Sequence, residues 1–182
     1  IYVTGLGVVS GIGLGVAENI ASLRKHQHGM GKVTLFPTEL DVPVSEVKYS
    51  NEELKRLLSL DIQKTFSRTA LLGMLAAREA VDDARLDLNT LRVGLISSTS
   101  VGGMDLSEHF YNAFKKDNRK GRLREVISHD CGASTEMIAD YLKVNDFVTT
   151  ISTACSSAAN AIMLGARMIR NGQLDAAIVG GT

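Results

Sequence analysis

Short β-rich segments alternate with segments of helical periodicity along the 182 residues, and this alternation restricts the fold more than any other feature. The β-rich segments predict strands at 1–9, 92–98, 147–153 and 176–181. Apolar side chains recur at helical spacing in 14–27, 64–85, 104–116, 134–143 and 156–171. The alternation predicts an α/β fold, layered, with a mostly parallel mixed sheet flanked by helices.

Helix boundaries follow from a few capping residues. We expect Asn51 to cap a short helix over NEELKRLLSL, and Ser134 or Thr135 to cap the helix at 134–143. Gly172 is placed to end the helix at 156–171 as its C′ residue. Residues 28–50, which contain both prolines, are expected to form a long surface excursion.

Composition excludes several classes of protein. The chain is long enough for one domain, and 45% hydrophobic residues argue against a disordered chain. Twenty basic and twenty acidic residues cancel, so no overall basic field for nucleic acid is expected. No apolar run approaches the roughly 20 residues of a membrane span, so we expect no membrane partner.

The two cysteines and the chain ends also carry information. Cys131 and Cys155 cannot form a disulfide framework, which favours a reducing, cytoplasmic setting. The chain begins inside a predicted strand, without methionine or a signal peptide, and stops directly after another strand. We therefore expect both ends to be cut from a longer chain.

Cys155 is the residue best placed for chemistry. It follows a predicted buried strand and stands at the first turn of the next helix, where unpaired backbone N–H groups favour a thiolate. The small residues of TACSSAA permit a tight strand-to-helix turn, as in a hydrolase nucleophile elbow. The alternative is a packing role, since cysteine is among the most buried residue types.

Two other candidate motifs do not match the patterns that a dinucleotide site or a zinc site requires. Gly5-x-Gly7-x-x-Ser10 lacks the last residue of the dinucleotide fingerprint, and no second strand ends in an acidic residue about 20 residues later. His129 and Cys131 are too few ligands for a zinc site. The four histidines are interpreted as surface residues, and no cofactor or metal is expected.

Four segments together resemble the β-ketoacyl-acyl-carrier-protein synthases, the elongating ketosynthases of fatty-acid and polyketide synthesis: VTGLGVVSGIG, RVGLISSTSVGG, ISTACSSAANAI and DAAIVGGT. The resemblance implies that residues 1–182 are the N-terminal half of a thiolase-like fold, without the C-terminal half. It implies that Cys155 carries the acyl chain in a decarboxylative Claisen condensation with a malonyl thioester. It also implies that two histidines, a lysine and a second oxyanion donor lie in the missing half.

The resemblance further implies partners and secondary site residues. Val101 aligns with a position that lines the acyl pocket, although a hydrophobic turn residue is an equal alternative. Acyl carrier protein is the implied partner, and basic residues are candidates to dock it, although most charge runs are solvated loops: Lys64, Arg68, Arg119, Lys120, Arg122 and Arg124.

The resemblance also bears on the oligomeric state and on whether the chain is an enzyme. The resemblance implies a homodimer that pairs the strand at 147–153 with its copy. Two alternatives to an enzyme half stay open: a non-catalytic partner subunit of the chain-length-factor kind, which usually lacks the cysteine, and an inert folded fragment.

Overall fold

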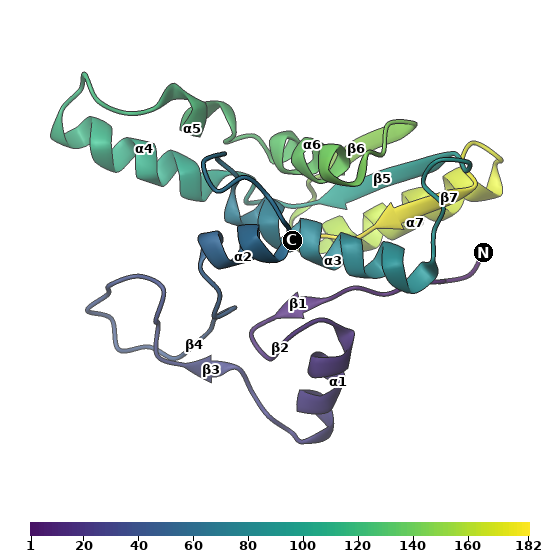
Figure 1. Cartoon of the computed structure of the whole chain (residues 1–182), viewed down its shortest axis with the longest axis horizontal. Helices are drawn as coiled ribbons and strands as arrows, with labels where there is room; N and C mark the ends of the chain where they lie inside the picture. Colours follow the sequence, from purple (N-terminus) through teal and green to yellow (C-terminus); the bar gives the residue numbers. More distant parts are fainter.

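A three-stranded parallel sheet forms the centre of the protein, in a computed structural model that describes residues 1–182 (Figure 1). Strand β5 (Val93–Ser98) lies between β6 (Phe147–Ile151) and β7 (Ala176–Val179). The register places Leu95 opposite Val148 on one side and Ile178 on the other. Because all three strands run parallel, their carboxyl ends meet at one edge of the sheet. The predicted α/β architecture is confirmed.

Helices cover both faces of this sheet (Figure 1). Helices α3 (Arg68–Ala84) and α6 (Cys131–Leu142) pack together on one face, where Val93 and Leu95 of β5 join their core. Helix α7 (Ser157–Arg170) covers the other face, against Ile96. Alternate residues of β5 thus enter different cores, as the pleat of a strand requires.

The remaining elements surround these layers. Helices α1 (Val16–Arg24) and α2 (Asn51–Leu57) precede α3, while α4 (Met104–Lys116) and α5 (Leu123–Ile127) form an arm beyond one end of the sheet (Figure 1). The antiparallel strands lie outside the main sheet in two ribbons. These pair β1 (Val9–Ser10) with β2 (Gly13–Leu14), and β3 (Met30–Gly31) with β4 (Val44–Ser45).

The predicted strand at 1–9 is wrong for residues 1–8, which join no ladder. Instead, the backbone N–H groups of Leu6 and Val8 donate to the carboxylates of Asp83 and Glu79 on α3, at 2.9 and 3.0 Å. Gly7 lies so close to α3 that a Cβ there would collide with the carbonyl oxygen of Ala76. The glycines of this segment therefore serve close packing on a helix.

Several predicted helix ends are corrected. Ser50, not Asn51, caps α2, through a capping box in which Glu53 reaches back to the Ser50 N–H at 2.7 Å. Helix α6 begins at Cys131 behind Asp130, so Ser134 and Thr135 are buried in its interior rather than at its cap. Gly172 does follow α7 in a left-handed conformation, with φ 69°, as predicted.

Helix α4 and the long excursion both agree with their predictions. Helix α4 spans 104–116 as predicted, and it buries no residue fully. Residues 28–50 contain only the short strands β3 and β4, which agrees with a surface excursion. No helix of the structure has the length and apolar character that crossing a bilayer demands.

Candidate active site

The loops that follow the three parallel strands meet at the carboxyl edge of the sheet, where ligands commonly bind in α/β folds. The loop after β6 holds Cys155, and the loop after β5 holds Val101. The segment after β7 closes onto this edge, because the Thr182 N–H donates to the carbonyl of Ser98 at 2.9 Å. A Cβ on Gly181 would contact the Cβ of Ala158, in the first turn of α7, at 3.5 Å.

Cys155 sits in a sharp turn between strand and helix. The turn is a single 3-10 turn, Ala154–Ser156, rather than the predicted start of an α-helix, and α7 follows directly. Ala154 has φ 52°, in the left-handed region that costs an alanine about 1–2 kcal/mol. Cys155 is exposed, which argues against the packing alternative and for an accessible nucleophile.

Side-chain hydrogen bonds hold the turn on both sides of Ala154. The Ser157 hydroxyl accepts from the Thr153 N–H at 2.8 Å and donates to the Ala154 carbonyl at 2.7 Å. The Ser156 hydroxyl donates to the Thr153 carbonyl at 2.8 Å, and Asn160 Nδ2 donates to Thr153 Oγ1 at 2.9 Å. The strained residue is therefore fixed by Ser156 in the 3-10 turn and by Ser157 and Asn160 in α7.

Of the backbone N–H groups in this turn, that of Cys155 remains available beside the sulfur. The N–H groups of Ser156 and Ser157 are satisfied by the carbonyls of Thr153 and Ala154. The Cys155 N–H makes no hydrogen bond within the chain. An unsatisfied backbone donor next to a nucleophile is suited to an oxyanion that develops on a bound carbonyl group.

Val101 lies at the start of the arm, after the end of β5, and its side chain is 51% exposed. Its N–H donates to Thr99 Oγ1 at 3.1 Å, and Gly102 takes a left-handed turn with φ 57°. Val101 and Cys155 thus follow neighbouring parallel strands, β5 and β6. Val101 presents an apolar side chain at the edge where the thiol stands.

The basic candidates divide into two groups. Arg119, Lys120 and Arg122 are exposed between α4 and α5, and Arg124 is exposed within α5. Arg119 and Lys120 also contact Asp117. Lys64 is exposed before α3.

Arg68 is placed differently from the other basic candidates. Its guanidinium donates to the carbonyls of Val47 and Tyr49 at 2.6 and 2.9 Å, and to Asn51 Oδ1 at 3.0 Å. Burial lowers the pKa of Arg68, and the negative charges of Glu46 and Asp105 oppose that shift. Arg68 thereby joins the surface excursion to α2 and α3.

The histidines are dispersed and do not converge on Cys155. His129 Nδ1 bonds the Ser107 hydroxyl at 2.9 Å, and His109 Nδ1 lies 3.1 Å from Glu125. No group of three or more His, Cys, Asp or Glu side chains is arranged to hold a metal ion.

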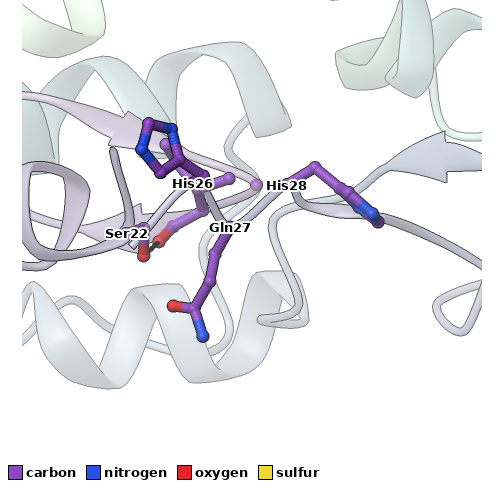
Figure 2. Close-up of a pocket in the computed structure, with 6 residues that line it drawn as sticks. Ser22, His26, Gln27 and His28 are labelled. Atoms are coloured by element: carbon purple, nitrogen blue, oxygen red, sulfur yellow. Dashed lines mark hydrogen bonds between the residues drawn. The ribbon is translucent and has the colours of Figure 1, made fainter. Parts of the chain in front are cut away.

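His26 and His28 line a separate, open depression of about 500 Å³ at the end of α1 (Figure 2). Figure 2 shows their rings pointing apart on either side of Gln27. The depression contains no residue of the Cys155 turn, and its polar groups do not converge on one point.

The fold and this strand-to-helix turn define a ketosynthase-type chain of the thiolase-like class. The family model "Beta-ketoacyl synthase, N-terminal domain" matches residues 1–182, and the chain belongs to this family.

Curated relatives match over the whole chain. The 3-oxoacyl-[acyl-carrier-protein] synthase 2 of Staphylococcus aureus (strain COL) is 28% identical over 191 residues, which cover 100% of this chain and 45% of the relative. The synthase 2 of Coxiella burnetii (strain RSA 493 / Nine Mile phase I) is also 28% identical, with the same coverage. The chain thus spans less than half the length of these relatives.

Solved structures agree on the fold. The ishigamide ketosynthase/chain length factor superposes with a TM-score of 0.87 at 29% identity, over 98% of this chain and 46% of that one. The ketosynthase ApeO in complex with its chain length factor ApeC, from Xenorhabdus doucetiae, gives a TM-score of 0.70 at 23% identity. That match covers 99% of this chain and 46% of the other, and at this identity it supports the fold alone.

Sequence reasoning missed the residues that shape the turn. It treated Thr153, Ser156 and Ser157 only as small residues, and it gave Asn160 no role. The spacing of Thr153 and Ser157, four residues apart across a strand-to-helix junction, is the signal that was available. The left-handed conformation of Ala154 had no such signal, because alanine does not favour it.

Proposed function

We propose that this chain is the nucleophile-bearing, N-terminal half of a β-ketoacyl-acyl-carrier-protein synthase in fatty-acid or polyketide synthesis. The observation that carries the proposal is the exposed Cys155 in a strained turn, with its own N–H free to donate. Family membership and the names of the curated relatives support the same class of reaction.

The first half-reaction is transfer of an acyl group to Cys155. The sulfur attacks the carbonyl carbon of an acyl-carrier thioester, and the carbonyl oxygen becomes an oxyanion near the Cys155 N–H. The carbon–sulfur bond to the carrier then breaks. The carrier leaves as a thiol with the proton that Cys155 lost, and an acyl-cysteine thioester remains.

The second half-reaction is decarboxylative condensation. A malonyl thioester loses carbon dioxide, and the resulting enolate carbon attacks the acyl-cysteine carbonyl. The bond to Cys155 breaks, the sulfur takes up a proton, and the product is a β-ketoacyl thioester. By resemblance, two histidines, a lysine and a second oxyanion donor for this step come from a second half, outside these 182 residues.

Val101 is proposed to limit the acyl chain. Its exposed side chain follows β5, which is the neighbour of the strand that leads to Cys155, and this placement supports the proposal. A hydrophobic turn residue without contact to substrate is the alternative. The two are distinguished by chain-length preference, which a Val101→Ala change shifts only in the first case.

Acyl carrier protein is proposed to dock on the basic side chains, because an acidic partner is steered by positive charge. The best placed are the four exposed cations from Arg119 to Arg124, in the loop before α5 and in α5 itself, and Lys64 is a further exposed candidate before α3. The guanidinium of Arg68 is already bonded to the carbonyls of Val47 and Tyr49, so its contribution is to hold the surface excursion in place.

A homodimer is proposed through residues 147–153. Strand β6 is an edge of the sheet, and its free side is open to pairing with a second copy. Val148 on this strand is 37% exposed.

Two alternatives remain to be tested. The similarity to the ishigamide ketosynthase/chain length factor favours a partner subunit, whereas the presence of Cys155 argues for the catalytic one. Exposed Ile162 and Met163 on α7 leave an apolar face, which favours an inert fragment when the chain stands alone.

Acylation is the decisive experiment. The full-length gene product is incubated with acetyl- or hexanoyl-coenzyme A, and the bound acyl group is located by peptide mass spectrometry. We expect the acyl group on Cys155, none on Cys131, and none after Cys155→Ala. Condensation with a malonyl carrier protein then separates an enzyme from a partner subunit, and absence of acyl-Cys155 in the native protein contradicts the proposal.

A further inference from the structure

The Ser157 hydroxyl occupies an unusual position beside the proposed nucleophile. Ser157 is 5% exposed, whereas the neighbouring residues Cys155 and Ser156 are exposed. Its Oγ atom bonds two peptide groups, the Thr153 N–H at 2.8 Å and the Ala154 carbonyl at 2.7 Å. Ala154, between these contacts, holds the left-handed conformation.

The second of these contacts concerns Cys155 directly. The Ala154 carbonyl and the Cys155 N–H belong to one peptide group, which is planar and trans, so they point in opposite directions. A hydrogen bond that fixes the direction of the carbonyl therefore fixes the direction of the N–H. That N–H is the donor left free beside the sulfur.

The hydrogen bond from the Thr153 N–H to the Ser157 hydroxyl keeps Ala154 in its left-handed conformation. Ala154 would leave the left-handed region by rotating its flanking peptides, and the Thr153 N–H bond holds the preceding residue. This N–H has no other acceptor in the chain, so its only partner is the Ser157 hydroxyl. Loss of the hydroxyl leaves the Thr153 N–H unpaired and leaves the Ala154 carbonyl with the Ser157 N–H alone as its donor, so the peptide before Cys155 is held less firmly.

We propose that Ser157 is a positioning residue, whose buried hydroxyl directs the Cys155 N–H toward the oxyanion formed during acylation. The inference rests on the proposed function, because it concerns the acyl-transfer step. It assigns the hydroxyl no contact with substrate. Its effect is confined to reactions that pass through an oxyanion.

Two reactions of the same sulfur separate positioning from general damage. Acylation by hexanoyl-coenzyme A forms a tetrahedral oxyanion, whereas alkylation by iodoacetamide displaces iodide and forms none. We expect Ser157→Ala in the full-length protein to slow maximal acylation roughly 10- to 100-fold, since misplaced catalytic groups cost about that much. The half-saturating thioester concentration and the alkylation rate should stay within about twofold of native, because neither depends on the oxyanion donor.

Matched variants control for folding and for the loss of a hydroxyl. Ser22→Ala removes a helix serine that donates to the Ile12 carbonyl at the same 2.7 Å, outside the turn, and should leave both reactions unchanged. Ser157→Thr keeps a hydroxyl on the same carbon and should restore acylation. Thermal unfolding is followed for every variant.

The outcomes are distinct. Equal slowing of acylation and alkylation by Ser157→Ala, or no slowing of either, overturns the positioning role while leaving acyl transfer intact. Equal loss of acylation in Ser157→Thr and Ser157→Ala, with native stability and alkylation, also overturns it. A native protein that is alkylated at Cys155 but never acylated overturns the proposed function itself, and the positioning role with it.

Discussion

Arg92 and Asp175 form a two-pronged ion pair that joins the residue before β5 to the residue before β7. Arg92 Nη2 lies 2.7 Å from Asp175 Oδ1, and Arg92 Nε donates to Oδ2 at 3.0 Å. The Arg92 backbone N–H also donates to Oδ2, at 2.9 Å. These hydrogen bonds fix the register of two neighbouring parallel strands at their amino ends.

The pair predicts an acid-sensitive contribution to stability. Hydrogen bonds from the Arg92 side chain and backbone lower the pKa of Asp175 from 3.8 to about 2. A carboxylate with a lowered folded-state pKa stabilises the fold above its unfolded pKa, and the contribution is lost as pH falls from about 4 to 2. Asp175→Asn should therefore lower the melting temperature at pH 7, and the difference from native should shrink toward pH 2.

The effect is expected to be small, because both side chains are solvent-exposed. Glu52→Gln breaks a looser exposed pair, 3.5 Å from Arg56, and serves as the control with a still smaller effect. A difference in melting temperature between the native protein and the Asp175→Asn variant that does not change with pH contradicts the assignment.

Gly7→Ala tests the packing of the N-terminal segment on α3. The added methyl group meets the Ala76 carbonyl, so we expect the free energy of unfolding to fall by about 1–3 kcal/mol in urea titrations. Gly31→Ala is the matched control, since no atom lies within 4 Å of its Cβ position. Equal effects of the two substitutions would refute close packing as the reason for Gly7.

Leu71→Ala tests the core between α3, α6 and the sheet. Leu71 is fully buried, so the lost methyl groups and the resulting cavity should cost about 2–5 kcal/mol of unfolding free energy. Leu123→Ala removes the same atoms from a residue that is 73% exposed, and should change stability by less than about 0.5 kcal/mol. Similar losses of unfolding free energy in both variants would contradict the burial of Leu71 in this core.

Ala154→Gly tests the strain before Cys155. Relief of the left-handed conformation favours glycine by about 1–2 kcal/mol, and the extra entropy of the unfolded chain opposes it by about 0.5–1 kcal/mol. We expect a net gain of about 0.5 kcal/mol in unfolding free energy. Ala166→Gly in the interior of α7 should instead lose about 0.5–1 kcal/mol, and the same sign at both positions would contradict the strain.

Local sequence patterns correctly predicted some of the helices and strands. Strand β5 and helix α4 appear where apolar runs and helical spacing placed them. The prediction of a strand at 1–8 failed because a β-rich pattern does not show whether a partner strand is present. Carboxylates on α3 accept hydrogen bonds from the backbone N–H groups of this segment instead. The capping errors at Asn51 and Ser134 arose because the adjacent residues Ser50 and Asp130 offer side-chain acceptors at the true helix starts.

The sequence by itself determined the class of fold, the family and the identity of the candidate nucleophile, because periodicity and the TACSS motif are local properties of the chain. Only the tertiary structure decided how Cys155 is presented. The end of β6 and the start of α7 meet at this turn. The structure shows there the left-handed conformation of Ala154, the two hydrogen bonds of the Ser157 hydroxyl and the free Cys155 N–H. Alanine alone does not encode that geometry, since the hydrogen bonds from Ser157 hold a left-handed conformation that an isolated alanine disfavours.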